Sequence, residues 1–115
     1  MSKPELVYFD GEGRAEPIRI LFHIAGKEFV DTRFVGKDWP DIKPTTPLGS
    51  VPVLKVDGEQ YCQSVSMNRY AAKLAGWYPS DELQALKCDM VAESINELTS
   101  AAPKVSIVIF FSKKV

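Results

Sequence analysis

The pair Asp57-Gly58 lies between two segments that are rich in β-forming residues, at 51–56 and 59–63. Asp-Gly is a preferred sequence for the two-residue turn between antiparallel strands, because both positions of that turn need positive φ angles. We therefore predict a β-hairpin in the middle of the chain. The rest of the fold is built around this hairpin.

On both sides of the hairpin, apolar residues recur with the periods that are typical of strands and helices. Pro17 in a first helical turn and Gly26 after a last one are typical helix bounds. Ser64 is the expected N-cap of the helix that follows the hairpin. The predicted elements are a strand at 5–9, a helix at 14–25, a strand at 29–34, a loop with a short helical piece at 36–47, and a helix at 64–75.

This order predicts an α/β fold, a βαβ unit followed by a ββα unit, which is the thioredoxin-like arrangement. In thioredoxin-like redox proteins a C-x-x-C motif opens the first helix. Here Asp10-Gly11-Glu12-Gly13 stands at that place. Since no thiol is present there, disulfide exchange is excluded.

A second helical unit is predicted from Pro79 onward, with Ser80 as the expected N-cap. The helix is expected to end near Ser100, before Pro103. The tail at 105–111 is β-branched and aromatic, which favours an extended segment prone to edge pairing and aggregation. We expect the apolar face of this helix to lack a partner in this chain. That face includes Leu86, Met90, Val91, Ile95 and Leu98.

Composition narrows the class of function. The net charge is −1 and no basic patch stands out, so nucleic acid and anionic membranes are not expected partners. No signal peptide or membrane-spanning stretch is recognised, and the expected compartment is the cytosol. Cys62, Cys88 and His23 fit no metal-ligand spacing and are interpreted as structural, so no metal is expected.

Four segments, in order and at matching separations, resemble the sigma-class glutathione transferases, especially the flatworm members. They are Tyr8-Phe9-Asp10-Gly11-Glu12-Gly13-Arg14-Ala15-Glu16 with Ile18-Arg19 following, then Asp38-Trp39-Pro40-Asp41-Ile42-Lys43-Pro44, then Gly49-Ser50-Val51-Pro52-Val53-Leu54, and Gln63-Ser64 followed by Asn68-Arg69-Tyr70. The resemblance runs from about residue 5 to residue 100. It implies a glutathione-binding domain at 1–78 and, at 79–115, the truncated start of an all-α C-terminal domain with an atypical tail.

The resemblance implies that Tyr8 and Arg14 are the catalytic residues, with the Tyr8 hydroxyl donating to the glutathione sulfur and Arg14 holding that network. A free thiol with a pKa of ~8.5 is mostly protonated at pH 7. Lowering that pKa by one unit needs about 1.4 kcal/mol, which one charge-assisted hydrogen bond could supply. From the residues alone, a half-buried strand tyrosine and a solvated surface arginine remain the alternatives.

The same resemblance implies the remaining glutathione contacts. Val51, before a cis Pro52, would pair its backbone with the cysteinyl residue, and Gln63 and Ser64 would bind the γ-glutamyl carboxylate at a helix N-terminus. The other implied contacts are Trp39, Lys43 and Ser50 for the glycyl end, and Glu97 as a candidate contact to a neighbouring subunit. Packing explains Trp39 equally well, and capping explains Ser64.

Ser50 departs from the family pattern, because many relatives carry a longer side chain there, and weaker glutathione binding is expected.

Three functions are compatible with the sequence. The first is a glutathione transferase acting on a small electrophile, as a homodimer in full-length form, with glutathione-dependent prostaglandin D isomerisation as a variant. The others are a truncated, non-catalytic glutathione-binding or dimerisation fragment and a crystallin-like structural relative, against which Tyr8 and Arg14 argue.

Overall fold

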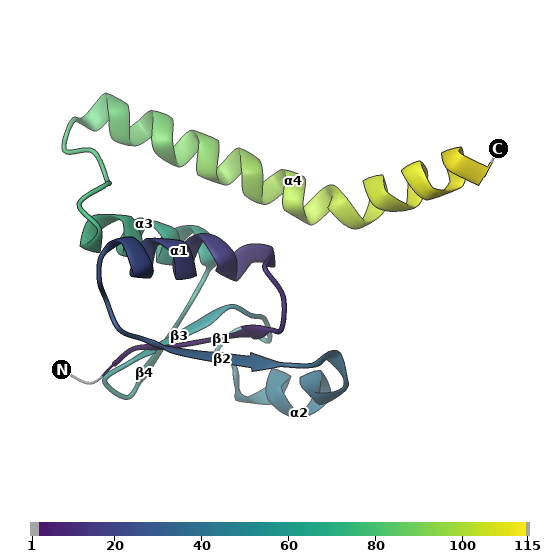
Figure 1. Ribbon diagram of the computed structural model, residues 1–115, viewed down its shortest axis with the longest axis horizontal. Coiled ribbons are helices and arrows are strands. Elements are labelled where there is room, and N and C mark those ends of the chain that lie inside the picture. The colour runs from purple at the N-terminus through teal and green to yellow at the C-terminus, as the bar shows by residue number, and fades with distance from the viewer. Residues whose placement is uncertain (1–2, 115) are drawn as a thin grey trace. The chain divides into compact units, whose positions relative to one another are not determined.

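The structure, a computed structural model, describes the backbone of residues 3–114 and the side chains of residues 3–101. The chain forms two compact units, one that ends at Tyr78 and one that begins at Pro79 (Figure 1). All strands of the described chain lie in the first unit, whereas the second unit consists of a short connection and one long helix.

The first unit is built on a mixed four-stranded sheet with the strand order β2-β1-β3-β4. Strands β1 and β2 are parallel, whereas β1 with β3 and β3 with β4 are antiparallel. The predicted α/β arrangement of a βαβ unit followed by a ββα unit is therefore confirmed. The strands are β1 (Glu5–Phe9), β2 (Val30–Phe34), β3 (Val53–Val56) and β4 (Glu59–Cys62).

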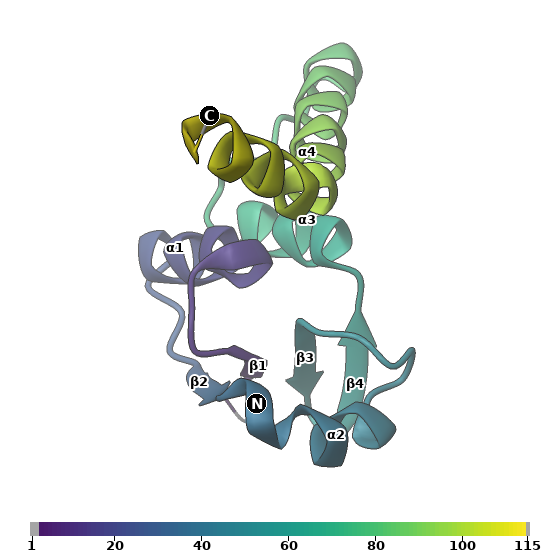
Figure 2. The ribbon, with the colours of Figure 1, turned by 90° about the vertical axis from the view of Figure 1, so that its right-hand side faces the viewer.

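Helices cover both faces of this sheet. Helices α1 (Glu16–Ile24) and α3 (Ser64–Leu74) lie on one side, and α2 (Trp39–Ile42) lies on the other (Figure 2). A 3-10 turn, η1 (Gly13–Ala15), precedes α1, so the predicted helix at 14–25 begins with a 3-10 turn, which is more tightly wound than an α-helix. Two further 3-10 turns, η2 (Gly36–Asp38) and η3 (Lys43–Thr45), flank α2 and confirm the predicted loop with a short helical piece.

The ends of two hairpin strands differ from the prediction for local reasons. Strand β3 begins at Val53 because Pro52, at its start, has no N–H for the ladder. Strand β4 ends at Cys62, since Gln63 has a φ of +77° and leaves the extended conformation. The turn itself is as predicted, with positive φ angles at both Asp57 and Gly58.

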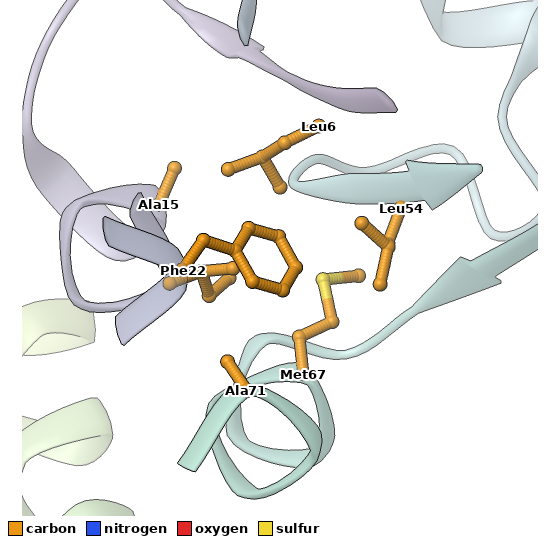
Figure 3. Close-up of a cluster of buried hydrophobic side chains, with 7 residues drawn as sticks. Leu6, Ala15, Phe22, Leu54, Met67 and Ala71 are labelled. Atoms are coloured by element: carbon orange, nitrogen blue, oxygen red, sulfur yellow. The ribbon is translucent and has the colours of Figure 1, made fainter. Parts of the chain in front are cut away.

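Two hydrophobic clusters hold the first unit together, one on each face of the sheet, because successive residues of β1 point to opposite sides. The smaller cluster contains Val7, Phe34 and Val53 and packs against α2 residues. In the main cluster, Phe22 of α1 lies between side chains of the sheet and of α3 (Figure 3). The main cluster consists of Leu6, Ala15, Ile18, Phe22, Leu54, Met67 and Ala71.

Both predicted N-caps are wrong. The N-cap of α3 is Gln63, which makes no side-chain capping hydrogen bond, and Ser64 is the first helical residue. The last helix begins at Glu82, and its cap is Asp81, whose Oδ2 accepts the Gln84 N–H at 2.9 Å. A carboxylate at this position also complements the helix dipole, which favours Asp81 over the neighbouring serine.

The last helix, α4 (Glu82–Lys114), continues through Pro103 to Lys114, so the predicted end near Ser100 and the extended tail are wrong. A proline removes one backbone hydrogen bond inside a helix, which can bend the helix instead of ending it, and the α4 ribbon bends along its length (Figure 1). The β-branched tail residues cost less than ~1 kcal/mol each in a helix, and adding residues to an existing helix is favourable.

Within the second unit, the described residues leave the apolar face of α4 exposed, as the sequence predicts. Its large apolar side chains are between 54% and 70% exposed. They are Leu83, Leu86, Met90, Val91, Ile95 and Leu98. None of the helices that the structure describes is long and apolar enough to cross a membrane.

The two isoleucines of α1 allow a matched test of the main cluster. Ile18 is fully buried, whereas Ile20 is 50% exposed. We expect Ile18→Ala to lower the free energy of unfolding by about 2–5 kcal/mol, because it leaves a cavity, and Ile20→Ala to lower it by less than about 1 kcal/mol. Urea unfolding followed by tryptophan fluorescence measures both values. Equal losses would contradict the assigned position of the core.

Candidate functional site

Tyr8, near the end of β1, is half-buried and packs against the main cluster. Its hydroxyl oxygen accepts a hydrogen bond from the backbone N–H of Arg14, with 3.3 Å between nitrogen and oxygen. This contact uses a lone pair of the oxygen, so the phenolic hydrogen can be donated to a further acceptor. Tyr8 and Arg14, predicted as a pair, are therefore brought together, through the backbone of Arg14.

Gly13 makes the close approach between Tyr8 and the η1 turn possible. A Cβ atom added at Gly13 would collide with the Tyr8 hydroxyl oxygen and lie 2.9 Å from the Cε2 atom of its ring. The φ angle of Gly13 is +42°, a conformation that side-chain-bearing residues seldom adopt. The sequence resemblance includes this glycine, but only the structure shows that it packs against Tyr8.

Arg19 belongs to the first of the resembling segments, but the sequence assigned it no role beside Tyr8. Its side chain is only 3% exposed, and its guanidinium carbon lies 5.9 Å from the centre of the Tyr8 ring. The Nη1 atom donates to the Gly11 carbonyl oxygen at 2.6 Å and to Glu16 Oε2 at 3.0 Å. The available signal was a charged residue between Ile18 and Ile20, on a helix whose neighbouring positions are apolar.

Two residues of β2 extend this charge network on the α1 side of the sheet. Asp31 Oδ1 accepts from Arg19 Nε at 3.0 Å, and Asp31 Oδ2 accepts from Arg33 Nε at 3.1 Å. Arg33 Nη1 also lies 3.4 Å from Asp10 Oδ1, in the segment after β1. The hydrogen bond that Arg33 donates to Asp31 raises the pKa of Arg33 above its ordinary value, more than any other cause does.

A second group of predicted residues lies between α2 and β3. The side chain of Lys43 passes Gly49, since a Cβ at Gly49 would lie 3.5 Å from Lys43 Cε. Lys43 is thus placed beside the backbone that leads into Ser50 and Val51. The peptide bond between Val51 and Pro52 is cis, as the resemblance implied.

The Gln63-Ser64 pair stands where β4 gives way to α3. Gln63 is exposed and adopts φ +77° and ψ 105°, an unusual conformation for a residue with a side chain. Such strained residues concentrate at functional sites, where the surrounding structure fixes them. Here the conformation turns the chain into the N-terminus of α3, where the first N–H groups of a helix have no helical partner.

Trp39 and Glu97 are placed less specifically. The Trp39 ring is stacked on Phe34, with centroids 5.8 Å apart and an interplanar angle of 6°, and also contacts Phe9. The Trp39 ring therefore packs against the smaller hydrophobic cluster. Packing is the alternative role that the sequence left open for this residue. Glu97 lies exposed on α4.

A separate pocket of about 220 Å³ lies between the hairpin and α3. Its lining is mostly apolar or aromatic, and none of the residues predicted for glutathione belongs to it. The lining residues are Leu54, Val56, Tyr61, Cys62, Ser66, Met67 and Tyr70. No cluster of three or more potential metal-ligating side chains occurs in the part of the chain that the structure describes.

Comparisons with known proteins identify the relatives of this chain. Glutathione S-transferase S1 of Drosophila melanogaster is 41% identical over 92 residues, which are 80% of this chain and 37% of that protein. The structure of prostaglandin synthase D of Nilaparvata lugens matches with a TM-score of 0.83 and 41% identity, covering 90% of this chain and 52% of that one. Monomeric Na-GST-3, a glutathione S-transferase of the hookworm Necator americanus, matches with a TM-score of 0.83 and 32% identity, covering 96% of this chain and 54% of that one. No family model matches.

The chain is therefore related in sequence and in fold to the glutathione transferases, and its first unit has their thioredoxin-like fold. Its relatives include both sigma-like transferases and prostaglandin D synthases, so the resemblance found in the sequence is confirmed. The chain spans about half the length of these relatives or less.

Two glycines of one segment test the contact between Gly13 and Tyr8. We expect Gly13→Ala to lower the free energy of unfolding by more than about 1 kcal/mol, because a Cβ there meets Tyr8 and strains a positive φ. Gly11→Ala is the control, since a Cβ there has no atom within 4 Å among the described residues. Its effect should stay within about 1 kcal/mol. Urea unfolding measures both, and a neutral Gly13→Ala would contradict the packing.

Proposed function

We propose that this chain binds glutathione and activates its thiol as a thiolate for conjugation to small electrophiles. The observation that carries the proposal is the hydrogen bond from the Arg14 N–H to the Tyr8 hydroxyl, at 3.3 Å. It orients the phenol so that its own hydrogen can be donated to a sulfur atom. The thiol proton is first lost to solvent. The sulfur anion then forms a bond to an electrophilic carbon, and the bond from that carbon to its leaving group breaks, so that the leaving group departs to solvent with the electron pair.

The remaining predicted residues are proposed to hold the three parts of glutathione. The backbone of Val51, next to Pro52, pairs with the cysteinyl residue, and Gln63 with Ser64 binds the γ-glutamyl carboxylate at the start of α3. The positive φ of Gln63 supports this role. Such a conformation costs free energy, and residues that adopt it concentrate at ligand-binding sites. The proposed contacts to the glycyl carboxylate are Lys43, Trp39 and Ser50.

Glutathione-dependent isomerisation to prostaglandin D is the second candidate activity. The similarity to the prostaglandin synthase D of Nilaparvata lugens favours it, since that match covers 90% of this chain at 41% identity. Both activities start from the same activated sulfur, so the proposed roles of Tyr8 and Arg14 serve either reaction.

We also propose the cytosol as the compartment and a homodimer as the assembly. Both cysteines, Cys62 and Cys88, are free thiols, the state that a reducing compartment maintains. The exposed apolar side chains of α4 provide a surface that assembly would cover. One relative, Na-GST-3, was solved as a monomer, so the assembly has to be measured for this chain.

Tyr8→Phe tests the proposed activation. We expect conjugation of a generic electrophile to fall tenfold or more, which corresponds to about 1.4 kcal/mol of lost thiolate stabilisation, with nearly unchanged glutathione affinity. Turnover at fixed pH and calorimetric titration with glutathione provide the two values. Tyr61→Phe is the control, because that exposed hydroxyl bonds Glu59 at 3.1 Å. Unchanged turnover in the Tyr8 variant would reject Tyr8 as the activating group.

Glu97→Gln tests the proposed cross-subunit contact. If Glu97 reaches glutathione bound to a neighbouring subunit, the substitution weakens glutathione binding about tenfold in the dimer and leaves a monomer unaffected. Sedimentation at several concentrations and calorimetric titration measure assembly and affinity together. Glu93→Gln, one helical turn earlier on α4, is the matched control. Equal loss of affinity in a demonstrated monomer would show that the contact lies within one chain.

A further inference from the structure

A closed circuit of charged contacts surrounds the segment between β1 and the η1 turn. Asp10 contacts Arg33, Arg33 contacts Asp31, and Asp31 contacts Arg19. Arg19 then returns to the backbone at Gly11, the residue after Asp10, through a hydrogen bond of 2.6 Å. The segment is thus tied at two successive residues to one network that spans β2 and α1.

Asp31 is the shared member of this circuit. Its two carboxylate oxygens are divided between the two arginines, with Oδ1 at 3.0 Å from Arg19 Nε and Oδ2 at 3.0 Å from Arg33 Nη2. Arg33 is 39% exposed, whereas Arg19 is 3% exposed, so Asp31 connects a surface charge to a buried one. A buried guanidinium depends on such partners, because it has lost its hydration.

Arg19 has few alternatives to Asp31. Its buried Nη2 atom has no hydrogen-bond partner among the residues that the structure describes. The guanidinium is therefore held by Nε on Asp31 and by Nη1 on Glu16 and Gly11. Asp31→Asn loses the ion pair and keeps only a weaker, neutral acceptor for Nε, so the Nη1 contacts become the main attachment, about which the guanidinium plane can tilt.

Arg19 also contacts two parts of the Tyr8 site at once. Its guanidinium lies 5.9 Å from the centre of the Tyr8 ring, within the range of a cation–π contact. Its hydrogen bond to Gly11 fixes the segment that leads to Gly13 and Arg14, the residues that touch the Tyr8 hydroxyl. The position of Arg19 thus determines both how the ring is supported and where its hydroxyl is held.

We propose that Asp31 is a positioning residue for Tyr8, which acts through Arg19 and touches neither glutathione nor the reacting sulfur. This role rests on the proposed activation of glutathione by Tyr8. The proposal predicts that losing the charge of Asp31 raises the pKa of the bound thiol, whereas the charge alone would have the opposite effect. Loss of a nearby negative charge should favour an anionic sulfur, whereas loss of positioning weakens the hydrogen bond that stabilises it.

The decisive measurement is the pH titration of bound glutathione, followed by thiolate absorbance, in the complete chain. We expect Asp31→Asn to raise the pKa of the bound thiol and to lower the thiolate fraction at neutral pH about threefold to tenfold. Asp31→Glu keeps the charge and should recover most of the thiolate. An unchanged or lowered thiol pKa in Asp31→Asn would overturn the proposal.

Glu5→Gln is the matched control for this substitution. Glu5 is 33% exposed, close to the 31% of Asp31, and its carboxylate also bridges strands, through Thr32 at 2.6 Å and Lys55 at 3.9 Å. It lies at the other end of β1, outside the circuit. Its substitution should leave the pKa of the bound thiol unchanged, and a shift equal to that of Asp31→Asn would overturn the proposal.

Tyr8→Phe shows whether the effect passes through Tyr8. In a Tyr8→Phe background, Asp31→Asn should not change the thiol pKa further, and a full additional shift would overturn the proposal. If Asp31→Asn does not fold, Arg33→Gln removes the exposed partner of Asp31 instead. The thiol pKa of this variant is then measured with Tyr8 and with Tyr8→Phe. A shift present only with Tyr8 supports positioning.

Tyr8 itself provides a measurement that does not need glutathione. Ring resonances of Tyr8 in the nuclear magnetic resonance spectrum should shift and broaden in Asp31→Asn but not in Glu5→Gln. If the parent chain binds glutathione without forming a thiolate, the proposed function fails, and these resonances still decide the role of Asp31. Unchanged Tyr8 resonances in a folded Asp31→Asn variant would overturn it.

Discussion

The buried guanidinium of Arg19 is the interaction on which the candidate site depends. The side chain of Arg19 is almost fully buried, so the charge has lost its hydration and has to be paired. Its partners are Asp31 on β2, Glu16 on α1 and the carbonyl of Gly11. One side chain therefore joins three segments, and Tyr8 lies against it.

The Tyr8 site combines this charged support with a steric one. The backbone at Gly13 touches the hydroxyl from one side, and the Arg14 N–H donates to it. A phenol held in this way has few orientations, which is the preorganisation that stabilising a thiolate requires. The strained Gln63 and the cis bond before Pro52 occur elsewhere in the same unit, at segments proposed to hold glutathione itself.

Much of the fold was predictable because its signals are local. Asp57-Gly58 predicted the hairpin turn, and Pro17 and Gly26 predicted the limits of α1, since each acts through its own φ angle or missing N–H. The errors came where several residues compete for one role. Ser80 and Asp81 are both suitable caps, and Pro103 can bend or end a helix, so sequence alone chose wrongly between them.

The sequence by itself determined the order of elements, because periodicity and turn signals act within a few residues. Its motifs also showed the relation to glutathione transferases, and that resemblance implied the candidate residues Tyr8, Arg14, Gln63 and Ser64. Only the tertiary structure decided that Arg19 is buried, that Asp31 pairs with it and that Gly13 touches Tyr8. These contacts join segments that the parallel pairing of β1 with β2 brings together. Arg19 and Asp31 are twelve residues apart in the chain, and the burial that makes their pairing necessary exists only after the layers have packed.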